Sequence, residues 1–316
     1  MRAVGIREFG GRDRLETMDV PEPKLGADGV LVRVHAAGVN PVDWKIREGR
    51  LDAGWPHVFP VVPGWDVAGT VERVGPAVTT VASGDEVYAY CRKHFVGEGA
   101  YAELVTVPET SVAHKPGSLD LEHAGAVPLC ALTAYQALFF GAGLTAGETV
   151  LVQAAAGGVG SFAVQLAADA GAEVIGTASE RNHEYVLGLG ALEVVDYRAV
   201  DAVDAVREIA PEGVDVVLDV YGGEALRRSV DAVRDEGRIV SIGQPPTDEH
   251  FRQRRIEPSY VFVRPDAEQL AEIADMFDDD RLTVHLDEVL PLEQAARAHE
   301  LSEAGHVRGK LVLRVA

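Results

Sequence analysis

One glycine-rich segment constrains the fold of this 316-residue chain more than any other feature. An apolar run, Thr149–Gln153, enters it, and an Ala- and Leu-rich stretch, Ser161–Ala170, leaves it. Between the two lies the sequence Ala154-Ala155-Ala156-Gly157-Gly158-Val159-Gly160. The order predicts a buried strand, a tight turn and a helix, which is the setting that a dinucleotide-binding loop requires.

Each glycine in this loop has an expected role. Gly157 and Gly158 would let the backbone approach a pyrophosphate, and Gly160 would let the helix pack closely on the strand. The start of the helix would add free N–H groups and a favourable dipole. The spacing departs from the usual Gly-x-Gly-x-x-Gly, and a purely structural turn is the alternative. We predict cofactor contacts from Ala156, Gly157, Gly158, Val159 and Gly160.

The next strand bears on the choice of cofactor. The strand Glu173–Ala178 ends without the carboxylate that normally bonds the ribose 2′-hydroxyl of NAD. Ser179 and Arg181 follow, and a hydroxyl with a guanidinium suits a 2′-phosphate, which favours NADP(H). Glu180 does not suit a 2′-phosphate unless the turn points its side chain to solvent. Arg181 could also be an ordinary surface residue. Tyr197 could contact the adenine of the cofactor, or it could be an ordinary core or surface residue.

The chain from 121 to 285 alternates predicted strands and helices, which indicates a doubly wound parallel sheet covered on both faces. One predicted helix, Leu121–Phe140, must be interrupted or kinked at Pro128. Ligands of such sheets bind beyond the carboxyl ends of the strands. The turns that begin at Val220 and Gly243 fall there, and we predict that their backbone groups contact the cofactor.

Residues 1–120 show a different sequence pattern. Short alternating or apolar runs, such as Val30–Ala37 and Val67–Val74, are separated by Gly, Pro and Asp, which predicts an antiparallel, barrel-like β domain. The final strand, Lys310–Val315, should return to this domain because the parallel sheet is already complete. We therefore expect an α/β protein of two domains, residues 1–120 with 286–316, and residues 121–285.

The net charge limits the binding partners and the cellular environment that we expect for this protein. Fifty acidic and twenty-nine basic residues give a net charge of −21, which makes nucleic acid an unlikely partner. No apolar stretch is long enough for a membrane span, and Met1–Phe9 lacks a signal-peptide pattern, so we expect a cytoplasmic protein. The acidic residues are spread along the whole chain. We hypothesise a halophilic source, because concentrated salt screens the self-repulsion of such a surface.

Several segments resemble one known family. They are Ala36–Arg47, Val62–Gly69, Leu132–Tyr135, Ala298-His299 and His306–Lys310, together with the glycine loop. In these segments the chain resembles the medium-chain dehydrogenase/reductase superfamily, and within it the zinc-free quinone oxidoreductase (zeta-crystallin-like) family. The resemblance implies a GroES-like first domain and a Rossmann second domain, with a substrate cleft between them.

The resemblance also bears on metals. Zinc-dependent members of the superfamily have cysteine and histidine where this chain has Asn40 and Trp65, and neither residue is a useful zinc ligand. Two cysteines are too few for a four-cysteine zinc lobe. We therefore expect no metal. Without a Lewis acid, an ordinary ketone is a poor hydride acceptor, whereas a quinone or an enone gives a delocalised anion.

Further site residues follow from the same resemblance. Asn40 would donate its amide N–H to a developing oxyanion, or be a turn asparagine before Pro41. Lys45 would stabilise negative charge or return a proton, or be an exposed cation. Trp44 and Trp65 would be walls for a flat substrate or packed core residues. The cofactor contacts that the resemblance adds are Asn40, Thr133, Phe262, Val263 and Lys310.

Together these points favour an NADPH-dependent quinone oxidoreductase that transfers hydride directly, without metal or flavin. Two alternatives stay open. The first is reduction of the double bond of α,β-unsaturated carbonyls, and the second is a non-catalytic NADPH-binding protein. The superfamily commonly pairs sheet edges, so a homodimer is plausible, with Arg238–Ile242 as the expected edge strand.

Overall fold

The computed structural model describes residues 1–247, 251 and 254–316, which form two compact units. Unit 1 comprises Met1–Leu129 and Pro265–Ala316, and unit 2 comprises Cys130–Arg264. From the sequence we expected the chain to divide after residues 120 and 285, whereas the units divide after residues 129 and 264.

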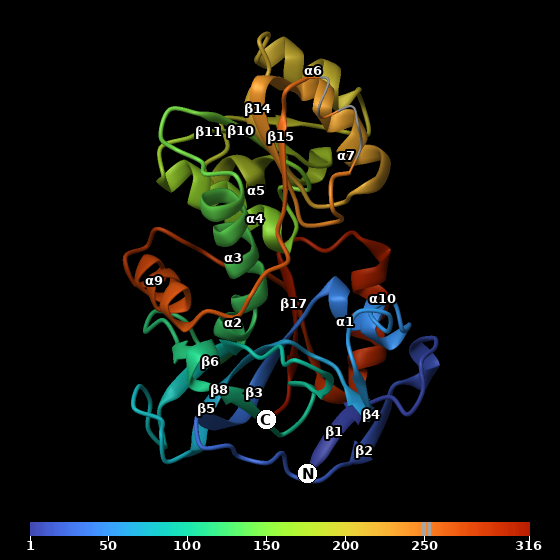
Figure 1. The fold of residues 1–316 in the computed structure, drawn as a ribbon, viewed down its shortest axis with the longest axis vertical. Helices are drawn as coiled ribbons and strands as arrows, with labels where there is room; N and C mark the ends of the chain where they lie inside the picture. Colours follow the sequence, from blue (N-terminus) through green and yellow to red (C-terminus); the bar gives the residue numbers. More distant parts are fainter. Residues whose placement is uncertain (248–250, 252–253) are drawn as a thin grey trace. The chain divides into compact units, whose positions relative to one another are not determined.

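Unit 1 is built mainly of strands (Figure 1). Its strands and helices are β1 (Arg2–Gly5), β2 (Glu16–Asp19), β3 (Gly29–Val39), α1 (Pro41–Arg47), β4 (His57–Val62), β5 (Asp66–Val74), β6 (Glu86–Tyr90), β7 (Val96–Glu98), β8 (Leu104–Pro108), β9 (Val112–His114), α2 (Leu121–Gly125), α9 (Ala267–Asp278), β16 (Leu286–Pro291), α10 (Ala295–Ala304) and β17 (Lys310–Arg314).

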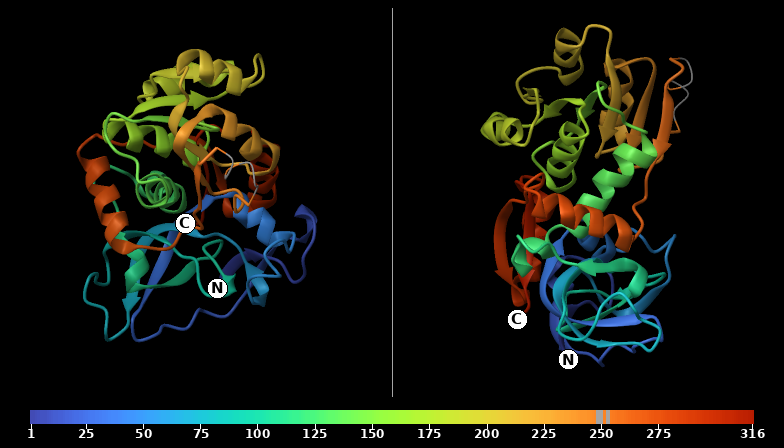
Figure 2. Two further views of the ribbon diagram at one scale, coloured as in Figure 1. Left: turned by 45° about the horizontal axis from the view of Figure 1, so that its top comes forward. Right: turned by 90° about the vertical axis from the view of Figure 1, so that its left-hand side faces the viewer.

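The long strand β3 organises the main sheet of unit 1. The sheet has the order β16-β17-β3-β5-β6-β9, and β8 also pairs with β3. The antiparallel pairing of β17 with β3 sets Leu311 opposite Val39, so the last strand returns to the first unit as predicted. Figure 2 shows the red C-terminal strand beside the blue β3. The predicted antiparallel character holds for most pairs, but β16–β17 and β4–β7 are parallel.

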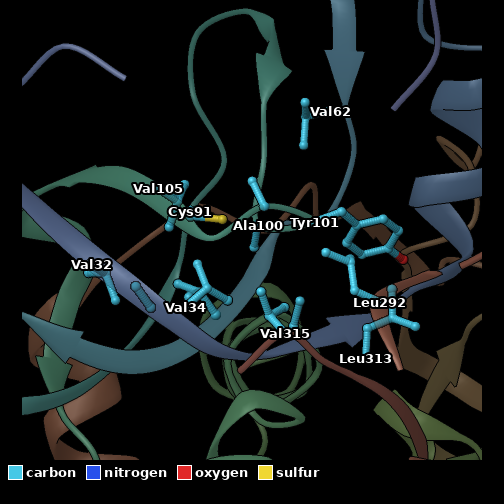
Figure 3. Packing of buried hydrophobic residues seen from close by; sticks show 14 of the residues in the cluster. Val32, Val34, Val62, Cys91, Ala100, Tyr101, Val105, Leu292, Leu313 and Val315 are labelled. Carbon is cyan, nitrogen blue, oxygen red and sulfur yellow. The ribbon is translucent and has the colours of Figure 1, made fainter. Parts of the chain in front are cut away.

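The core of unit 1 joins residues from both ends of the chain. Val32 and Val34 of β3 pack in one cluster with Leu292, Leu313 and Val315 (Figure 3). Each of these side chains is buried. Burying one such Leu stabilises the fold by about 2 kcal/mol, so the C-terminal segment contributes strongly to holding unit 1 together.

The helix α9 belongs to unit 1, which accounts for the shift of the second division of the chain from residue 285 to residue 264. One face of this helix is apolar and buried, with Leu270, Ile273 and Phe277 each at most 2% exposed. The hydroxyl of Tyr88 in β6 donates a hydrogen bond to the carbonyl of Leu270. Amphipathic periodicity predicts such a buried face, but it does not say which sheet covers it.

Unit 2 alternates strands with helices. They are α3 (Pro128–Tyr135, begun in unit 1) with a π-helical turn (Gln136–Gly141), β10 (Thr149–Val152), α4 (Gly158–Asp169), β11 (Glu173–Thr177), α5 (His183–Gly188), β12 (Glu193–Val195), α6 (Ala202–Ile209), β13 (Val214–Asp219), α7 (Gly223–Ser229), β14 (Val233–Ser241) and β15 (Glu257–Tyr260). The interruption predicted at Pro128 is confirmed, because α2 ends at Gly125 and Pro128 begins α3.

The sheet of unit 2 is parallel, with the order β12-β11-β10-β13-β14-β15. The chain moves outward from β10 through β12 and then crosses back to β13, so the order reverses between β10 and β13. Ligands bind beside such a reversal in doubly wound sheets. One expectation was wrong. Residues Arg238–Ile242 do not form an edge strand, because β14 lies between β13 and β15, and β15 is the edge in the described residues.

Candidate functional site

The glycine loop has the geometry of an anion-binding turn. The chain leaves β10 through Ala154, whose φ is +48°, and α4 begins at Gly158 with Gly157 as its N-cap. A Cβ on Gly160 would lie 2.2 Å from the carbonyl oxygen of Ala154, so only glycine allows this approach of helix and loop. Gly157, as the N-cap residue, has no side chain that could cap the helix. Its first N–H groups therefore suit an oxyanion such as a pyrophosphate.

The loop is joined to the end of β11. Thr177 ends this strand, and its hydroxyl accepts a hydrogen bond of 3.1 Å from the Ala154 N–H. Ser179 is buried just beyond, while Glu180 and Arg181 are exposed. Sequence reasoning missed Asp196, whose carboxylate accepts the Glu180 N–H at 3.3 Å. Its place just after β12 was the available signal. Tyr197, next to it, is 46% exposed.

The turns after β13 and β14 are built on Asp219, which sequence reasoning also missed. Its buried carboxylate accepts the Gly222 N–H at 3.0 Å and the hydroxyl of Ser241 at 2.5 Å. The two turns approach so closely that a Cβ on Gly243 would lie 2.6 Å from the Gly222 nitrogen. The structure thus brings together the turns that start at Val220 and Gly243, both singled out from the sequence.

The segment after β15 is held by a side chain from the π-helical turn. The Gln136 amide donates to the Arg264 carbonyl at 2.9 Å and accepts the Arg264 N–H at 3.0 Å. Val263 is buried and Phe262 is 43% exposed. Beside them lies a pocket of about 360 Å³, lined by Gln136, Phe140, Gly141, Ser259, Tyr260, Val261, Phe262 and Arg264. Thr133 is buried one turn earlier in α3.

In unit 1, Asn40 lies in a buried polar cluster. Its side chain has no exposed surface. The amide nitrogen donates to Asp66 Oδ2 at 2.8 Å, and the amide oxygen accepts a hydrogen bond from Lys310 Nζ. Asp66 Oδ1 accepts the Leu129 N–H at 2.6 Å. Burial raises the pKa of Asp66, while the neighbouring Lys310 ammonium opposes that rise.

A second buried carboxylate, Asp43, holds the start of α1. It accepts the Asn40 N–H at 2.7 Å and the Gly64 N–H at 3.1 Å. The first of these contacts caps the helix. Burial raises the pKa of Asp43 to about 7. The sequence contained both acids within family-like segments, but residue type alone gave no sign that they are buried.

The side chains of α1 that follow are more exposed. Trp44 and Lys45 are half-buried, and the Lys45 ammonium lies 5.6 Å from the centre of the Trp44 ring. Burial, and then repulsion by Arg50, lowers the pKa of Lys45. Within the described residues, no hydrogen bond or ion pair engages this ammonium. Trp65 is 5% exposed and packs edge-on against Trp55 and Tyr90, so it is a core residue.

The comparisons with known proteins decide the family. Residues 26–117 match the family described as "Alcohol dehydrogenase GroES-like domain", and residues 189–313 match "Zinc-binding dehydrogenase". The chain is 33% identical to the chloroplast envelope quinone oxidoreductase homolog of Arabidopsis thaliana, over 99% of this chain and 98% of that protein. The chain belongs to the quinone oxidoreductase family of the medium-chain dehydrogenase/reductase superfamily.

Solved structures place this family member in the same fold. The quinone oxidoreductase of Escherichia coli, solved in complex with NADPH, has a TM-score of 0.90, 27% identity and full coverage of both chains. A structure titled NAD-dependent alcohol dehydrogenase has a TM-score of 0.91 and 34% identity, also over both whole chains. The GroES-like and Rossmann domains expected from the sequence are confirmed, and this family member is an oxidoreductase.

The description "Zinc-binding dehydrogenase" raises the question of whether zinc suits these residues. At the two family positions for catalytic zinc ligands, Asn40 bonds the Lys310 ammonium and Trp65 packs among aromatic rings. Zinc at Asn40 would meet a like charge and no imidazole or thiolate, so the residues do not fit the metal. Across residues 1–247, 251 and 254–316, no three His, Cys, Asp or Glu side chains gather as metal ligands.

None of the helices described combines the length and the hydropathy that a membrane span requires.

Proposed function

We propose that this protein is an NADPH-dependent quinone oxidoreductase that uses no metal. Its family membership makes it an oxidoreductase, and the observation that carries the finer proposal is the glycine loop joined to an uncapped α4. Relatives named quinone oxidoreductase, at 31–33% identity over 99% of the chain, support the acceptor class. The Escherichia coli relative, solved with NADPH, supports the cofactor.

Unit 2 offers a set of groups suited to the cofactor. The N–H groups at the start of α4 would hold the pyrophosphate, and the Ser179 hydroxyl and Arg181 guanidinium would hold the 2′-phosphate. Asp196 works against a phosphate at that end, so the preference for NADPH depends on Arg181. Further contacts are proposed for Ala156, Gly157, Gly158, Val159, Gly160, Thr133, Tyr197, Val220, Gly243, Phe262 and Val263.

Unit 1 carries the groups proposed to act on the acceptor. NADPH, when bound, supplies a hydride. A quinone that accepts hydride becomes a phenolate, which then takes one proton to give the hydroquinone. The Asn40 amide nitrogen would donate a hydrogen bond to the charged oxygen, and the Lys45 ammonium would stabilise it and return the proton. The half-buried position of Lys45 and the lowered pKa of its ammonium suit a proton donor.

We also propose that the protein is a homodimer. The interface expected from the sequence changes, because Arg238–Ile242 is not the edge strand. Because β14 is an inner strand, we propose β15 as the strand that pairs with a second copy. Phe140 and Tyr260, near this edge, are 67% and 39% exposed. Exposed aromatic side chains beside a sheet edge are typical of a contact surface.

The direct test is a panel of quinones, α,β-unsaturated carbonyls and simple ketones, each offered with NADPH and with NADH. The proposal predicts the highest kcat/KM for a quinone with NADPH. Faster turnover of enones would establish the alternative reductase activity. Tight NADPH binding with no oxidation by any acceptor would show a non-catalytic binding protein.

A further inference from the structure

The turn that ends α1 brings two basic residues together. The Gly49 N–H donates to the Ile46 carbonyl and the Arg50 N–H donates to the Lys45 carbonyl, both at 2.9 Å. Gly49 has a φ of +77°. Two such bonds around a left-handed glycine are the Schellman motif, in which the residue after the glycine commonly packs on the last turn of the helix. An apolar pair is usual there, whereas this chain has Arg50 and Lys45.

The indole of Trp44 holds both of these cations. The Lys45 ammonium lies 5.6 Å from the centre of the ring, and the central carbon of the Arg50 guanidinium lies 4.8 Å from it. Attraction between a cation and an indole favours this position for each of them. The two cations also repel each other, because Arg50 follows burial as a cause that lowers the pKa of Lys45. Two like charges are thus held beside one ring.

The positive charge of this pair is only partly balanced. Arg50 lies 2.8 Å from a carboxylate oxygen of Glu48, but the same carboxylate accepts a hydrogen bond of 2.9 Å from the buried Arg47. In the part of the chain that the structure describes, no hydrogen bond or ion pair engages the Lys45 ammonium. Arg50 is exposed and Lys45 is half-buried, so both are accessible from solvent.

We propose that Lys45 and Arg50 form a subsite for an acidic group of the hydride acceptor, a carboxylate or a sulfonate carried on its ring. The inference rests on the proposed function, because that function places Lys45 beside the acceptor oxygen. An ammonium has three N–H donors and a guanidinium has five. The pair can therefore bind an acidic group while Lys45 still faces the reacting oxygen and Arg50 keeps its bond to Glu48.

The charge of the whole chain makes such a subsite selective. A net charge of −21 repels anions from most of the surface, so an acidic acceptor needs a local site of opposite charge. A neutral quinone gains nothing from the Arg50 guanidinium. Arg50 is therefore a specificity-determining residue, which should raise kcat/KM for acidic acceptors and leave kcat/KM for neutral acceptors unchanged.

The test compares 1,4-naphthoquinone-2-sulfonate with the neutral 2-methyl-1,4-naphthoquinone, each with NADPH at constant ionic strength. The measured quantity is the sulfonate preference, which is kcat/KM for the sulfonate divided by kcat/KM for the neutral quinone. Arg50→Met should lower it about fivefold to tenfold, and Arg50→Lys, which keeps the charge, should retain most of it. Arg33→Met is the matched control, because Arg33 is also exposed and paired with a glutamate, Glu72.

A second variant should act in the opposite direction. Glu48→Gln removes the charge that competes for Arg50 and keeps an oxygen that can accept from Arg47, which retains Glu303 at 2.7 Å. The sulfonate preference should then rise about twofold to fivefold. If Arg50 served only to anchor Glu48, both variants would lower the two kcat/KM values alike and leave the sulfonate preference unchanged. That result would overturn the inference.

Naphthalene-2-sulfonate, which cannot accept a hydride, separates this inference from the proposed function. Calorimetry with protein saturated with NADP+ should give a Kd that rises about fivefold in Arg50→Met and stays within about twofold in Arg33→Met. If the wild type reduces no quinone while this pattern holds, the proposed function fails and the anion subsite stands. An equal Kd in the wild type and in Arg50→Met would overturn the inference, whatever the wild type reduces.

Discussion

The hydroxyl of Tyr101 donates a hydrogen bond of 3.3 Å to the carboxylate of Asp43, and neither side chain has exposed surface. The Asp43 carboxylate thus accepts three hydrogen bonds, since it also accepts the backbone N–H groups of Asn40 and Gly64. Burial still outweighs these contacts and raises the pKa of Asp43 to about 7. Near neutral pH, both the charged and the protonated form of Asp43 are therefore populated.

This pKa makes the stability of the protein depend on pH. Unfolded aspartate has a pKa near 4, so between about pH 4 and pH 7 the folded chain binds more protons than the unfolded chain at this site. The contribution of Asp43 to stability is full below pH 4 and is lost as the pH rises towards 7. The change is on the order of 4 kcal/mol at most. Urea unfolding at constant ionic strength from pH 4 to pH 8 measures it.

The control for this prediction is Asp43→Asn, which cannot titrate. His299 acts in the opposite direction, because burial lowers its pKa to about 3 and its contribution is lost as the pH falls below about 6.5. The informative quantity is therefore the free energy of unfolding of the wild type minus that of the variant. A difference that stays level across this range would refute the assignment.

Lys45 is predicted to control the pH dependence of turnover. Only its protonated form can return a proton, and burial lowers its pKa, so kcat should fall as the pH rises past that value. Lys45→Met should lower kcat roughly tenfold to a hundredfold and remove this fall. Lys45→Arg should also remove this fall, because arginine stays charged over the whole pH range. Wild-type kcat and pH profile in Lys45→Met would exclude this role.

The glycine loop allows a matched pair of substitutions. Gly160→Ala sets a Cβ 2.2 Å from a backbone oxygen, so it should lower stability by about 1–3 kcal/mol and weaken NADPH binding at least tenfold. Gly188→Ala, in α5, meets no atom within 4 Å and should leave binding unchanged with equal or higher stability. Fluorescence titration with NADPH and thermal unfolding check both. Equal NADPH affinity in the two variants would place the pyrophosphate elsewhere.

The acidic composition predicts a requirement for salt. With a net charge of −21, lowering the ionic strength lengthens the range of repulsion between surface carboxylates. We expect the thermal midpoint and the activity to fall together when KCl is reduced from about 3 M to about 0.05 M, where the Debye length is several-fold longer. Fold and activity that stay unchanged in the dilute buffer would rule out salt adaptation.

The unit 2 architecture was largely predictable because its signals are local. Strand and helix periodicity around Gly160 indicated the loop, and the ring of Pro128 had to break a helix. The edge strand was missed because β15 is not an apolar run. Pro258 within Glu257–Tyr260 was the usable signal, since proline is confined to edge strands.

The polar cluster could not be predicted in the same way. Asp66 and Lys310 are 244 residues apart in sequence, and it is the pairing of both β17 and β5 with β3 that brings them together. Aspartate and lysine are usually exposed, so the burial of these two side chains could not be predicted from residue type. The cofactor role implied for Lys310 followed from its motif, whereas its contacts followed from the sheet.

The most direct test of the central claim is the kinetics of quinone reduction with NADPH deuterated at the transferred C4 position, using protein dialysed against a chelator. Direct hydride transfer to the quinone predicts full activity after dialysis and a primary isotope effect on kcat/KM. Loss of activity that added zinc restores would contradict the account. So would full activity with no isotope effect in single-turnover experiments, where the transfer step itself is observed.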